Sequence, residues 1–240
     1  MTGLNSAENG TAAAAPAIEC RALAFAYPGD APVLRGIDLA IPAGERMAIV
    51  GRNGSGKSTL VRTWNGLLRP AAGEVRVEGV GTVARRVADL ARVVGMTFQD
   101  PDRQLFGATC RDEVAFGARN VGVRDAELDT VVESALAAAG LGHAAGKHPY
   151  DLGGSWRRLL AIASVLAMRT PIIVLDEPTM GLDARQIDHV RSIVDDLATA
   201  GRTIVAVSHD ARFIEDSFAR VVRIEEGRLV DDGRPSEVLP

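Results

Sequence analysis

The chain has 240 residues, of which 47% are hydrophobic and 24% are charged, and this ordinary composition excludes a wholly disordered protein. At 100–200 residues per domain, the length allows one large domain or two small ones. The formal net charge is -4, which argues against a protein that binds nucleic acid through its phosphates.

The first sixteen residues, 1–16, are small and polar and are expected to form a disordered tail. No positively charged segment followed by an apolar one opens the chain, so export is not expected. Cys20 and Cys110 lie far apart in the sequence. Both are expected to be reduced thiols of a cytosolic protein.

The first half of the chain alternates strand patterns with turn residues. Residues Ile18 to Tyr27 alternate apolar and polar side chains, as a half-buried strand does. Met47 to Val50 is wholly apolar, as in a strand covered on both faces, and a helical pattern runs from the following glycine-rich segment to about Leu68. The pattern also predicts strands at Val33–Ile41, Val75–Val80 and Val94–Phe98, and a helix at Ala84–Val93.

From about Thr109 to Met168 the pattern is helical. Thr109 and Asp112 resemble a capping box, and Asp125 is expected to cap a helix that ends at Gly140. The longest nearly apolar run, at 159–168, is half the length that a bilayer requires, so no membrane-spanning helix is expected. We interpret the stretch as a helical insert, at about 101–169, in a single domain of residues 17–240 whose core is 17–100 and 170–240.

Strand and helix patterns alternate again after the insert. Pro171–Leu175 and Thr203–Val207 are predicted strands, with a helix near Ala184–Ala200 between them. Arg220–Glu225 and Arg228–Asp232 are expected to pair as a hairpin. Strands that alternate with helices predict an α/β fold with a largely parallel sheet.

A glycine-rich loop, GRNGSGKS at 51–58, fits the phosphate-binding pattern G-x-x-x-x-G-K-[ST] between a buried strand and a helix. Glycines are needed because several backbone N–H groups have to point at one phosphate chain. Lys57 is expected to reach the β- and γ-phosphates, and the Ser58 hydroxyl is expected to ligate Mg²⁺. The nucleotide-binding residues expected here are Asn53, Gly54, Ser55, Gly56, Lys57 and Ser58.

A pair of carboxylates ends the apolar segment IIVLDE at 172–177. Asp176 is expected to hold Mg²⁺, directly or through water. Glu177 points elsewhere and is placed to act as a general base on a water molecule. Alone, the pair would be interpreted as caps of the next helix; beside the phosphate loop, it predicts Mg²⁺-dependent hydrolysis of a nucleoside triphosphate.

Further motifs follow in a fixed order along the chain. Gln99 comes just after an apolar strand, IIVLDEP precedes the triplet Gly-Leu-Asp at 181–183, and His209 lies in VAVSHD. In this order and spacing, residues 18–239 resemble the ATP-binding cassette (ABC) family.

This resemblance implies a P-loop NTPase core with a mostly parallel sheet, an antiparallel β part and a helical subdomain. It implies that Tyr27 stacks on adenine and that Gln99 is the Q-loop glutamine, which contacts the metal and the reacting phosphate. It also implies that Asp183 belongs to the D-loop and that His209 is the switch histidine, which acts in catalysis beside Glu177.

Within the family, the segments Gln99–Gly117 and Trp64–Pro70 resemble the ATPases of energy-coupling factor (ECF) importers and of cobalt and nickel uptake systems. That resemblance implies a motor at the cytoplasmic face of the membrane for uptake of a vitamin or a transition-metal ion. Its partners would be a substrate-binding membrane protein and a transmembrane coupling protein, the latter received around Gln99–Phe106 and the following helix. The alternatives are another class of ABC transporter, a soluble non-transport ABC ATPase, and a partner subunit that binds ATP without hydrolysing it.

The family's signature motif, L-S-G-G-Q, is altered in this chain. Aligned without a gap, residues 152–156 read LGGSW: Gly153 stands for the serine, Ser155 for the second glycine and Trp156 for the glutamine, while Gly154 is retained. Either Ser155 caps the helix that follows and the contact with nucleotide is weaker, or the loop shifts so that Ser155 replaces the serine. Because the family shares its ATP sites across a dimer, the altered motif suggests a heterodimer of two ATPase subunits, with a homodimer as the alternative.

Overall fold

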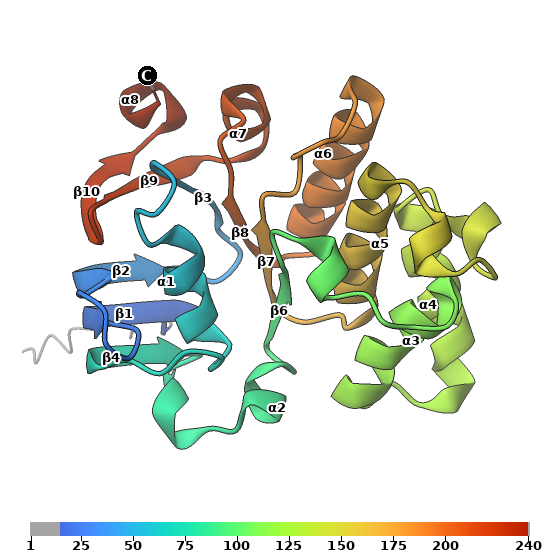
Figure 1. The fold of residues 1–240 in the computed structure, drawn as a ribbon, viewed down its shortest axis with the longest axis horizontal. Helices are drawn as coiled ribbons and strands as arrows, with labels where there is room; N and C mark the ends of the chain where they lie inside the picture. The colour runs from blue at the N-terminus through green and yellow to red at the C-terminus, as the bar shows by residue number, and fades with distance from the viewer. Residues whose placement is uncertain (1–14, 240) are drawn as a thin grey trace, which may run out of the picture.

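The structure is a computed structural model that describes residues 15–239. Residues 1–14 of the predicted tail therefore lie outside the described residues. Two β-sheets with a helix between them form one side of the molecule, and a group of helices forms the other (Figure 1).

The smaller sheet is antiparallel, with the order β2-β1-β4-β5. Its strands are β1 (Ile18–Phe25), β2 (Leu34–Ile41), β4 (Ala72–Val77) and β5 (Val80–Gly81). The strand predicted at 75–80 is divided into β4 and β5, because Glu78 and Gly79 form a turn with φ values of 50° and 74°.

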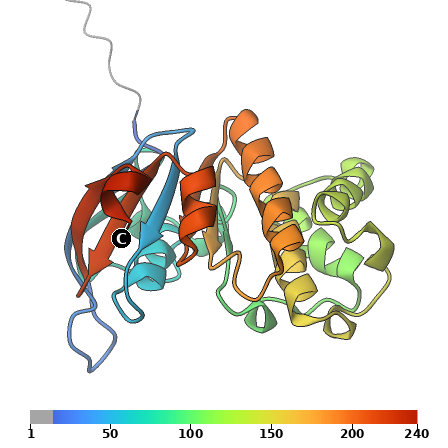
Figure 2. The ribbon, with the colours of Figure 1, turned by 90° about the horizontal axis from the view of Figure 1, so that it is seen from above.

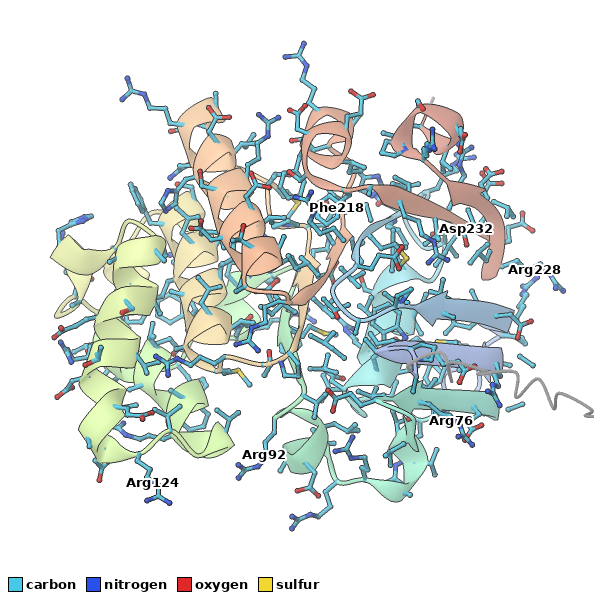
Figure 3. All side chains as sticks on the ribbon, turned by 180° about the vertical axis from the view of Figure 1, so that it is seen from behind. Arg76, Arg92, Arg124, Phe218, Arg228 and Asp232 are labelled. Atoms are coloured by element: carbon cyan, nitrogen blue, oxygen red, sulfur yellow. The ribbon has the colours of Figure 1, made fainter. Side chains whose placement is uncertain are left out.

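The larger sheet has the order β10-β9-β3-β8-β7-β6. Its strands are β3 (Arg46–Val50), β6 (Val94–Thr97), β7 (Ile172–Asp176), β8 (Thr203–Val207), β9 (Arg220–Glu225) and β10 (Arg228–Gly233). All neighbours are parallel except β9 and β10, which form the predicted hairpin. Arg228 and Asp232 mark β10 at the outer edge of this sheet in Figure 3. The prediction of a largely parallel sheet is thus confirmed.

Helix α1 (Lys57–Trp64) lies between the two sheets (Figure 2). Its buried residues Leu60, Val61 and Trp64 belong to a hydrophobic cluster that includes Ile18 of the smaller sheet and Ile49 of the larger one. This packing fixes the start of α1 against the carboxyl end of β3.

Four longer helices follow the order predicted for the middle of the chain: α3 (Cys110–Val121), α4 (Asp125–Ala138), α5 (Gly154–Ala167) and, after β7, α6 (Ala184–Thr199). Thr109 caps α3 by accepting a hydrogen bond from the Asp112 N–H. The predicted capping box is only half formed, because the Asp112 carboxylate accepts from the Thr109 hydroxyl, at 2.6 Å, in place of the Thr109 N–H. The prediction for Asp125 is wrong: Arg124 is the N-cap residue, and Asp125 is the first residue of α4, where an acidic side chain favours the helix dipole.

The helix predicted at Ala84–Val93 is also largely wrong. The structure has a 3₁₀ turn at Thr82–Ala84 and a single α-helical turn, α2 (Val87–Leu90). Arg85 and Arg86 between them are extended, with ψ values of 149° and 150°. Only Leu90 of α2 is buried, so an apolar face that would support a longer helix is missing from this segment.

The remaining short elements are α7 (Ala211–Ser217), α8 (Pro235–Val238) and 3₁₀ turns at Pro101–Arg103, Gly142–Ala144 and Pro149–Asp151. Among residues 15–239, every helix is too short or too polar to cross a bilayer.

Candidate functional site

Three neighbouring parallel strands, β3, β8 and β7, end at the same edge of the larger sheet. The glycine-rich loop follows β3, Asp176 and Glu177 end β7, and His209 comes shortly after β8. The carboxyl edge of a parallel sheet is where ligands bind in open α/β folds. Residues that are up to 158 positions apart in sequence, Gly51 and His209, are therefore brought to one site.

The phosphate loop bounds a cavity of about 420 Å³. It is lined by Tyr27, Val33, Asn53, Gly54, Gly56, Lys57, Ser58, Thr59, Gln99 and Glu177. Predicted residues from four separate segments thus meet at one cavity, whose size suits a nucleotide or similar ligand.

Lys57 lies across this loop. Its Nζ donates hydrogen bonds to the carbonyl oxygens of Gly51, at 2.6 Å, and Arg52, at 3.1 Å. Burial lowers the pKa of Lys57, and the nearby carboxylates of Glu177 and Asp176 raise it. The ammonium group is therefore held at the loop by main-chain carbonyls, in a position where a phosphate could replace them.

Gly51 permits the loop to begin. Its φ is 144°, and a Cβ atom at this position would lie 2.1 Å from the carbonyl oxygen of Ile224 on β9. A side chain is excluded by that strand, so the first position of the motif requires glycine for packing as well as for phosphate binding.

Tyr27 lies beyond the end of β1, two residues later than Phe25, and not within the strand as predicted. Its hydroxyl oxygen is 3.4 Å from Oγ1 of Thr59, and its ring packs edge-to-face on Phe25 with centroids 4.9 Å apart. These contacts hold an aromatic ring at the wall of the cavity, where it could bind the base of a nucleotide.

Ser58 and Asp176 provide the oxygen atoms expected for a metal site. Burial raises the pKa of Asp176, and the neighbouring Ser58 hydroxyl opposes this rise. Within the described part of the chain, the buried Oδ1 atom of Asp176 has no hydrogen-bond partner. A buried carboxylate oxygen without a partner, beside a hydroxyl, suits Mg²⁺, which prefers oxygen ligands. Gln99 lines the same cavity.

Glu177 and His209 are in direct contact: Nε2 of His209 lies 3.2 Å from Oε1 of Glu177. Burial raises the pKa of Glu177, and the neighbouring Asp176 raises it further. Burial lowers the pKa of His209, and the charge of Lys57 lowers it further. The pair is thus a carboxylate of increased basicity beside an imidazole that favours its neutral form, an arrangement suited to accepting a proton.

The main chain at Glu177 is held in an unusual conformation. Its φ is 51°, which non-glycine residues rarely adopt. The Glu177 N–H donates to the carbonyl oxygen of Val207 on β8, at 2.8 Å, and the Glu177 carbonyl accepts from Nη1 of Arg158, at 2.9 Å. Sequence reasoning did not identify Arg158 as part of the site. A signal was present, because this cation lies four residues before Ile162 on the buried face of an apolar helix.

The altered signature segment lies at the start of α5. The interpretation that Ser155 caps this helix is wrong: Gly153 is the N-cap residue, and Ser155 lies inside the first turn. Its Oγ accepts a hydrogen bond from Nε2 of Gln186, at 3.2 Å. Gln186 also forms a capping box with Asp183, the N-cap residue of α6.

The segment at 153–155 and Asp183 are therefore linked to each other and do not line the phosphate-loop cavity. Figure 1 shows the starts of α5 and α6 on the opposite side of β7 from α1. The residues predicted for the nucleotide thus form two groups in this chain, one at the phosphate loop and one at the two helix N-termini.

A second, larger cavity of about 630 Å³ lies beside Phe98, the residue before Gln99. It is bounded by α3, α5 and the segment after β6, and includes Met96, Phe98, Gln104, Phe106, Phe116 and Met168. Phe106 and Phe116 pack edge-to-face at its rim and are 63% and 47% exposed. We refer to this cavity and its rim as the aromatic groove.

The buried carboxylate of Glu113 anchors the main chain of the loop that carries Phe106. Oε2 of Glu113 accepts hydrogen bonds from the N–H groups of Phe106, at 2.8 Å, and Gly107, at 2.7 Å. The exposed ring is therefore fixed by main-chain contacts, in a segment that the sequence analysis expected to receive a partner.

Comparison with protein families and known proteins gives consistent results. Residues 34–180 match the family model of the ABC transporter. The energy-coupling factor transporter ATP-binding protein EcfA of Methanothermobacter thermautotrophicus is 40% identical over 224 residues, which cover 92% of this chain and 72% of EcfA.

Solved structures share the fold. One is CbiO1 from Clostridium perfringens, which is described as part of the ABC transporter complex CbiONQ. It superposes with a TM-score of 0.82 and 33% identity, over 93% of this chain and 90% of CbiO1. The dimeric structure of MJ0796, a bacterial ABC transporter cassette, has a TM-score of 0.83 and 26% identity, with 91% and 98% coverage.

Proposed function

Since the chain belongs to the ABC transporter family of ATP-binding proteins, we propose that it is the ATP-hydrolysing motor subunit of an ECF-type importer, which takes up a vitamin or a transition-metal ion. The observation that carries the proposal is the contact between His209 and Glu177, the carboxylate that lines the phosphate-loop cavity. The names of the similar proteins EcfA and CbiO1 support the importer class.

The phosphate loop binds the triphosphate of ATP in this proposal. Lys57 exchanges its main-chain acceptors for the β- and γ-phosphates, and the loop N–H groups bind the remaining oxygens. Residues 53–58 surround the phosphates, and Tyr27 stacks on the adenine ring. The altered binding segment 153–155 and Asp183 contribute to the nucleotide held by the other subunit.

Ser58, Asp176 and Gln99 would hold Mg²⁺, which when bound neutralises phosphate charge and lowers the energy of the transition state. Glu177 accepts a proton from a water molecule whose oxygen attacks the γ-phosphorus, while the bond from that phosphorus to the bridging oxygen breaks. The leaving oxygen carries its electron pair onto ADP. His209 holds the Glu177 carboxylate in position, and Gln99 orients groups around the γ-phosphate.

The catalytic cycle requires a second ATPase subunit. ATP bound at the phosphate loop stabilises a closed dimer, in which the helix N-termini of each subunit contact the nucleotide of the other. Loss of phosphate reopens it, which is a ligand-driven shift between two states. The altered segment, with Gly153 in place of the serine, supports a heterodimer in which this chain completes the partner's site poorly.

The aromatic groove is the surface for the transmembrane coupling protein. An apolar, partly exposed surface with fixed aromatic side chains is typical of interaction sites. Through that protein and a separate substrate-binding membrane protein, the chain would act peripherally at the cytoplasmic face of the membrane.

We further propose that residues 17–240 act as one domain. A single hydrophobic cluster extends from α3, α4 and α5 to β7 and β8, which supports this division. The helical part, at about 101–169, would be an insert that packs on the core and moves with it.

Purification of the affinity-tagged chain from membranes tests the importer class. The expected result is co-purification of one or more helical membrane proteins together with a second ATPase subunit, identified by mass spectrometry. Recovery of nucleic acid or of purely soluble partners instead would contradict the proposal and favour a non-transport ABC ATPase.

ATPase measurement with and without the second subunit tests the heterodimer. We expect turnover by the pair to exceed turnover by this chain alone, because the partner supplies an intact signature segment. Equal turnover per phosphate-loop site in the two preparations would contradict the heterodimer.

A further inference from the structure

Arg158 is a buried cation in an otherwise apolar part of α5. Its exposed fraction is 7%, and its neighbours along the helix, Leu159, Leu160 and Ile162, are buried as well. One nitrogen, Nη1, donates to two main-chain carbonyl oxygens: that of Gln99, at 3.0 Å, and that of Glu177, at 2.9 Å. A single side chain therefore joins three segments that are distant in sequence.

Burial of this guanidinium is unfavourable in itself. Burial lowers the pKa of Arg158, while the charges of Glu177, Asp100 and Asp176 raise it. Removing a guanidinium from water is costly, and an apolar side chain of similar volume would generally stabilise a core as well or better. The two hydrogen bonds to the loops thus suggest a role other than stability.

A second contact attaches the same helix to the Gln99 loop. Nε2 of Gln104 donates to the carbonyl oxygen of Ala161 on α5, at 3.3 Å, and Oε1 of Gln104 accepts from the N–H of Phe98, at 3.0 Å. The loop is therefore held by α5 at both of its ends, and a shift of the helix would move it.

The first turn of α5 lies close to Arg158. The helix begins at Gly154, and a rise of 1.5 Å per residue places Arg158 about 6 Å further along the axis. In the proposed dimer, this first turn faces the nucleotide of the other subunit. A displacement of α5 at that interface would be transmitted to the main chain of Glu177, which the Val207 carbonyl holds on its other side.

We propose that Arg158 is a positioning residue that fixes the main chain at Gln99 and Glu177 and couples the hydrolysis site of this chain to the signature segment at the start of α5. This inference rests on the proposed function, because it assumes that Glu177 acts in ATP hydrolysis.

The first test compares Arg158→Met and Arg158→Lys in the complex with the second ATPase subunit. Arg158→Met is expected to lower kcat by about 10–100-fold, because small misplacement of reacting groups is costly, while the dissociation constant for ATP stays unchanged. Arg158→Lys is expected to recover part of kcat, because its ammonium can still donate to main-chain carbonyls.

Arg157→Met is the matched control. Arg157 is the neighbouring residue on α5, but its guanidinium contacts the Leu152 carbonyl, at 3.2 Å, and the Asp102 carboxylate, at 2.9 Å. Its loss is expected to leave kcat within about twofold, since surface-type ion pairs contribute little. An unchanged kcat in Arg158→Met would overturn the proposal, and so would a parallel loss of ATP affinity and thermal stability, which indicates a structural role.

Hydrogen exchange of the isolated full chain gives a test that needs no ATPase activity. In Arg158→Met, amides in residues 98–104 and 177–182 are expected to exchange faster than in the unchanged chain, while those of α6 are not. If the unchanged complex hydrolyses no ATP and Arg158→Met still shows this exchange pattern, the proposed function is refuted and the positioning role remains supported. Unchanged exchange in either segment would overturn the positioning role.

Discussion

The carboxyl group of Glu177 is subject to opposing electrostatic effects. Burial and the nearby Asp176 raise its pKa, whereas the charges of Lys57 and Arg158 and the main chain of His209 lower it. Glu177 is therefore a stronger base than an exposed carboxylate. Because the pKa of His209 is lowered, its imidazole favours the neutral form and does not cancel the charge of Glu177. At the residue scale, the proposed catalysis thus depends on a few charged groups held in a partly buried site.

Glu177→Gln tests the general base. The amide keeps the size and the main-chain contacts of the residue but cannot accept the proton, so we expect ATP binding to persist and hydrolysis to fall by about 10²–10⁴-fold. Glu78→Gln is the matched control, because Glu78 is exposed and has a φ of 50°, close to the 51° of Glu177. Single-turnover measurement with radiolabelled ATP checks both variants, and near-normal turnover of Glu177→Gln would refute the role.

Lys57→Ala tests the phosphate loop. Loss of a charge-assisted hydrogen bond to phosphate, worth about 1.5–3 kcal/mol, is expected to weaken ATP binding by about 10–100-fold. The other lysine of the chain, the exposed Lys147, provides the control Lys147→Ala, which should bind ATP as the unchanged chain does. Titration calorimetry measures both affinities. Equal affinity in Lys57→Ala would contradict the assignment of this loop.

Contacts between elements decide the shape of the phosphate loop. The β9–β10 turn reaches over it: the Gly227 N–H donates to the Ser55 carbonyl, at 3.0 Å, and the Gly227 carbonyl accepts from the N–H of Arg35 on β2, at 2.8 Å. The hairpin therefore ties the smaller sheet to the site, although none of its residues lines the cavity. At the scale of elements, a turn distant in sequence supports the nucleotide site.

Gly227→Ala tests that support. A Cβ atom there would lie 2.1 Å from the Val33 carbonyl oxygen, and the φ of 78° disfavours any side chain. Overpacking and the left-handed backbone together are expected to lower the free energy of unfolding by about 2–5 kcal/mol, with weaker ATP binding as Ser55 shifts. Denaturant unfolding and ATP titration check the two effects.

The control for this substitution is Gly201→Ala. Gly201 has a similar φ of 72°, but a Cβ atom there meets nothing within 4 Å. It should lose only the backbone part, about 1–2 kcal/mol. Equal destabilisation by the two substitutions would show that the close packing of the turn is unimportant.

At the scale of the whole molecule, the two proposed functions, nucleotide binding and partner binding, belong to two separate surfaces. The phosphate-loop cavity lies at the carboxyl edge of the larger sheet, and the aromatic groove lies between that sheet and the helices α3 and α5. Gln99 lines the cavity, and five residues later Gln104 lines the groove. One loop therefore connects the two surfaces, as the proposed action of a motor on a membrane partner requires.

Phe106→Asp tests the groove. A charge on the most exposed aromatic ring is expected to reduce recovery of the transmembrane coupling protein by about tenfold or more, with ATP affinity unchanged, because Phe106 lies outside the cavity. Val230→Asp should not reduce it, because Val230 is 47% exposed and lies on β10, at the opposite edge of the larger sheet from β6. Quantitative co-purification measures both. Undiminished recovery of the membrane protein with Phe106→Asp would contradict the docking surface.

Short-range patterns in the sequence were sufficient for much of the fold. The parallel strands β3 and β7 were predicted correctly, because each is a contiguous apolar run. The glycine-rich loop and the carboxylates at 176 and 177 follow these strands, and their roles remain predictions from the motif spacing. The same local logic failed at 84–93, where helix-forming residues lack an apolar face to bury, and at Asp125 and Ser155, where the helix starts one or two residues earlier than expected.

Only the tertiary structure revealed what joins these motifs. Arg158 donates hydrogen bonds to the carbonyl oxygens of Gln99 and Glu177, and Gly227 donates one to that of Ser55. These bonds connect residues that are 19 to 172 positions apart in the sequence. The acceptors of these hydrogen bonds leave no residue-type pattern in the sequence, because every residue offers the same main-chain carbonyl oxygen. The sequence therefore predicted the local motifs, whereas the hydrogen bonds that join them depend on how the strands and helices pack.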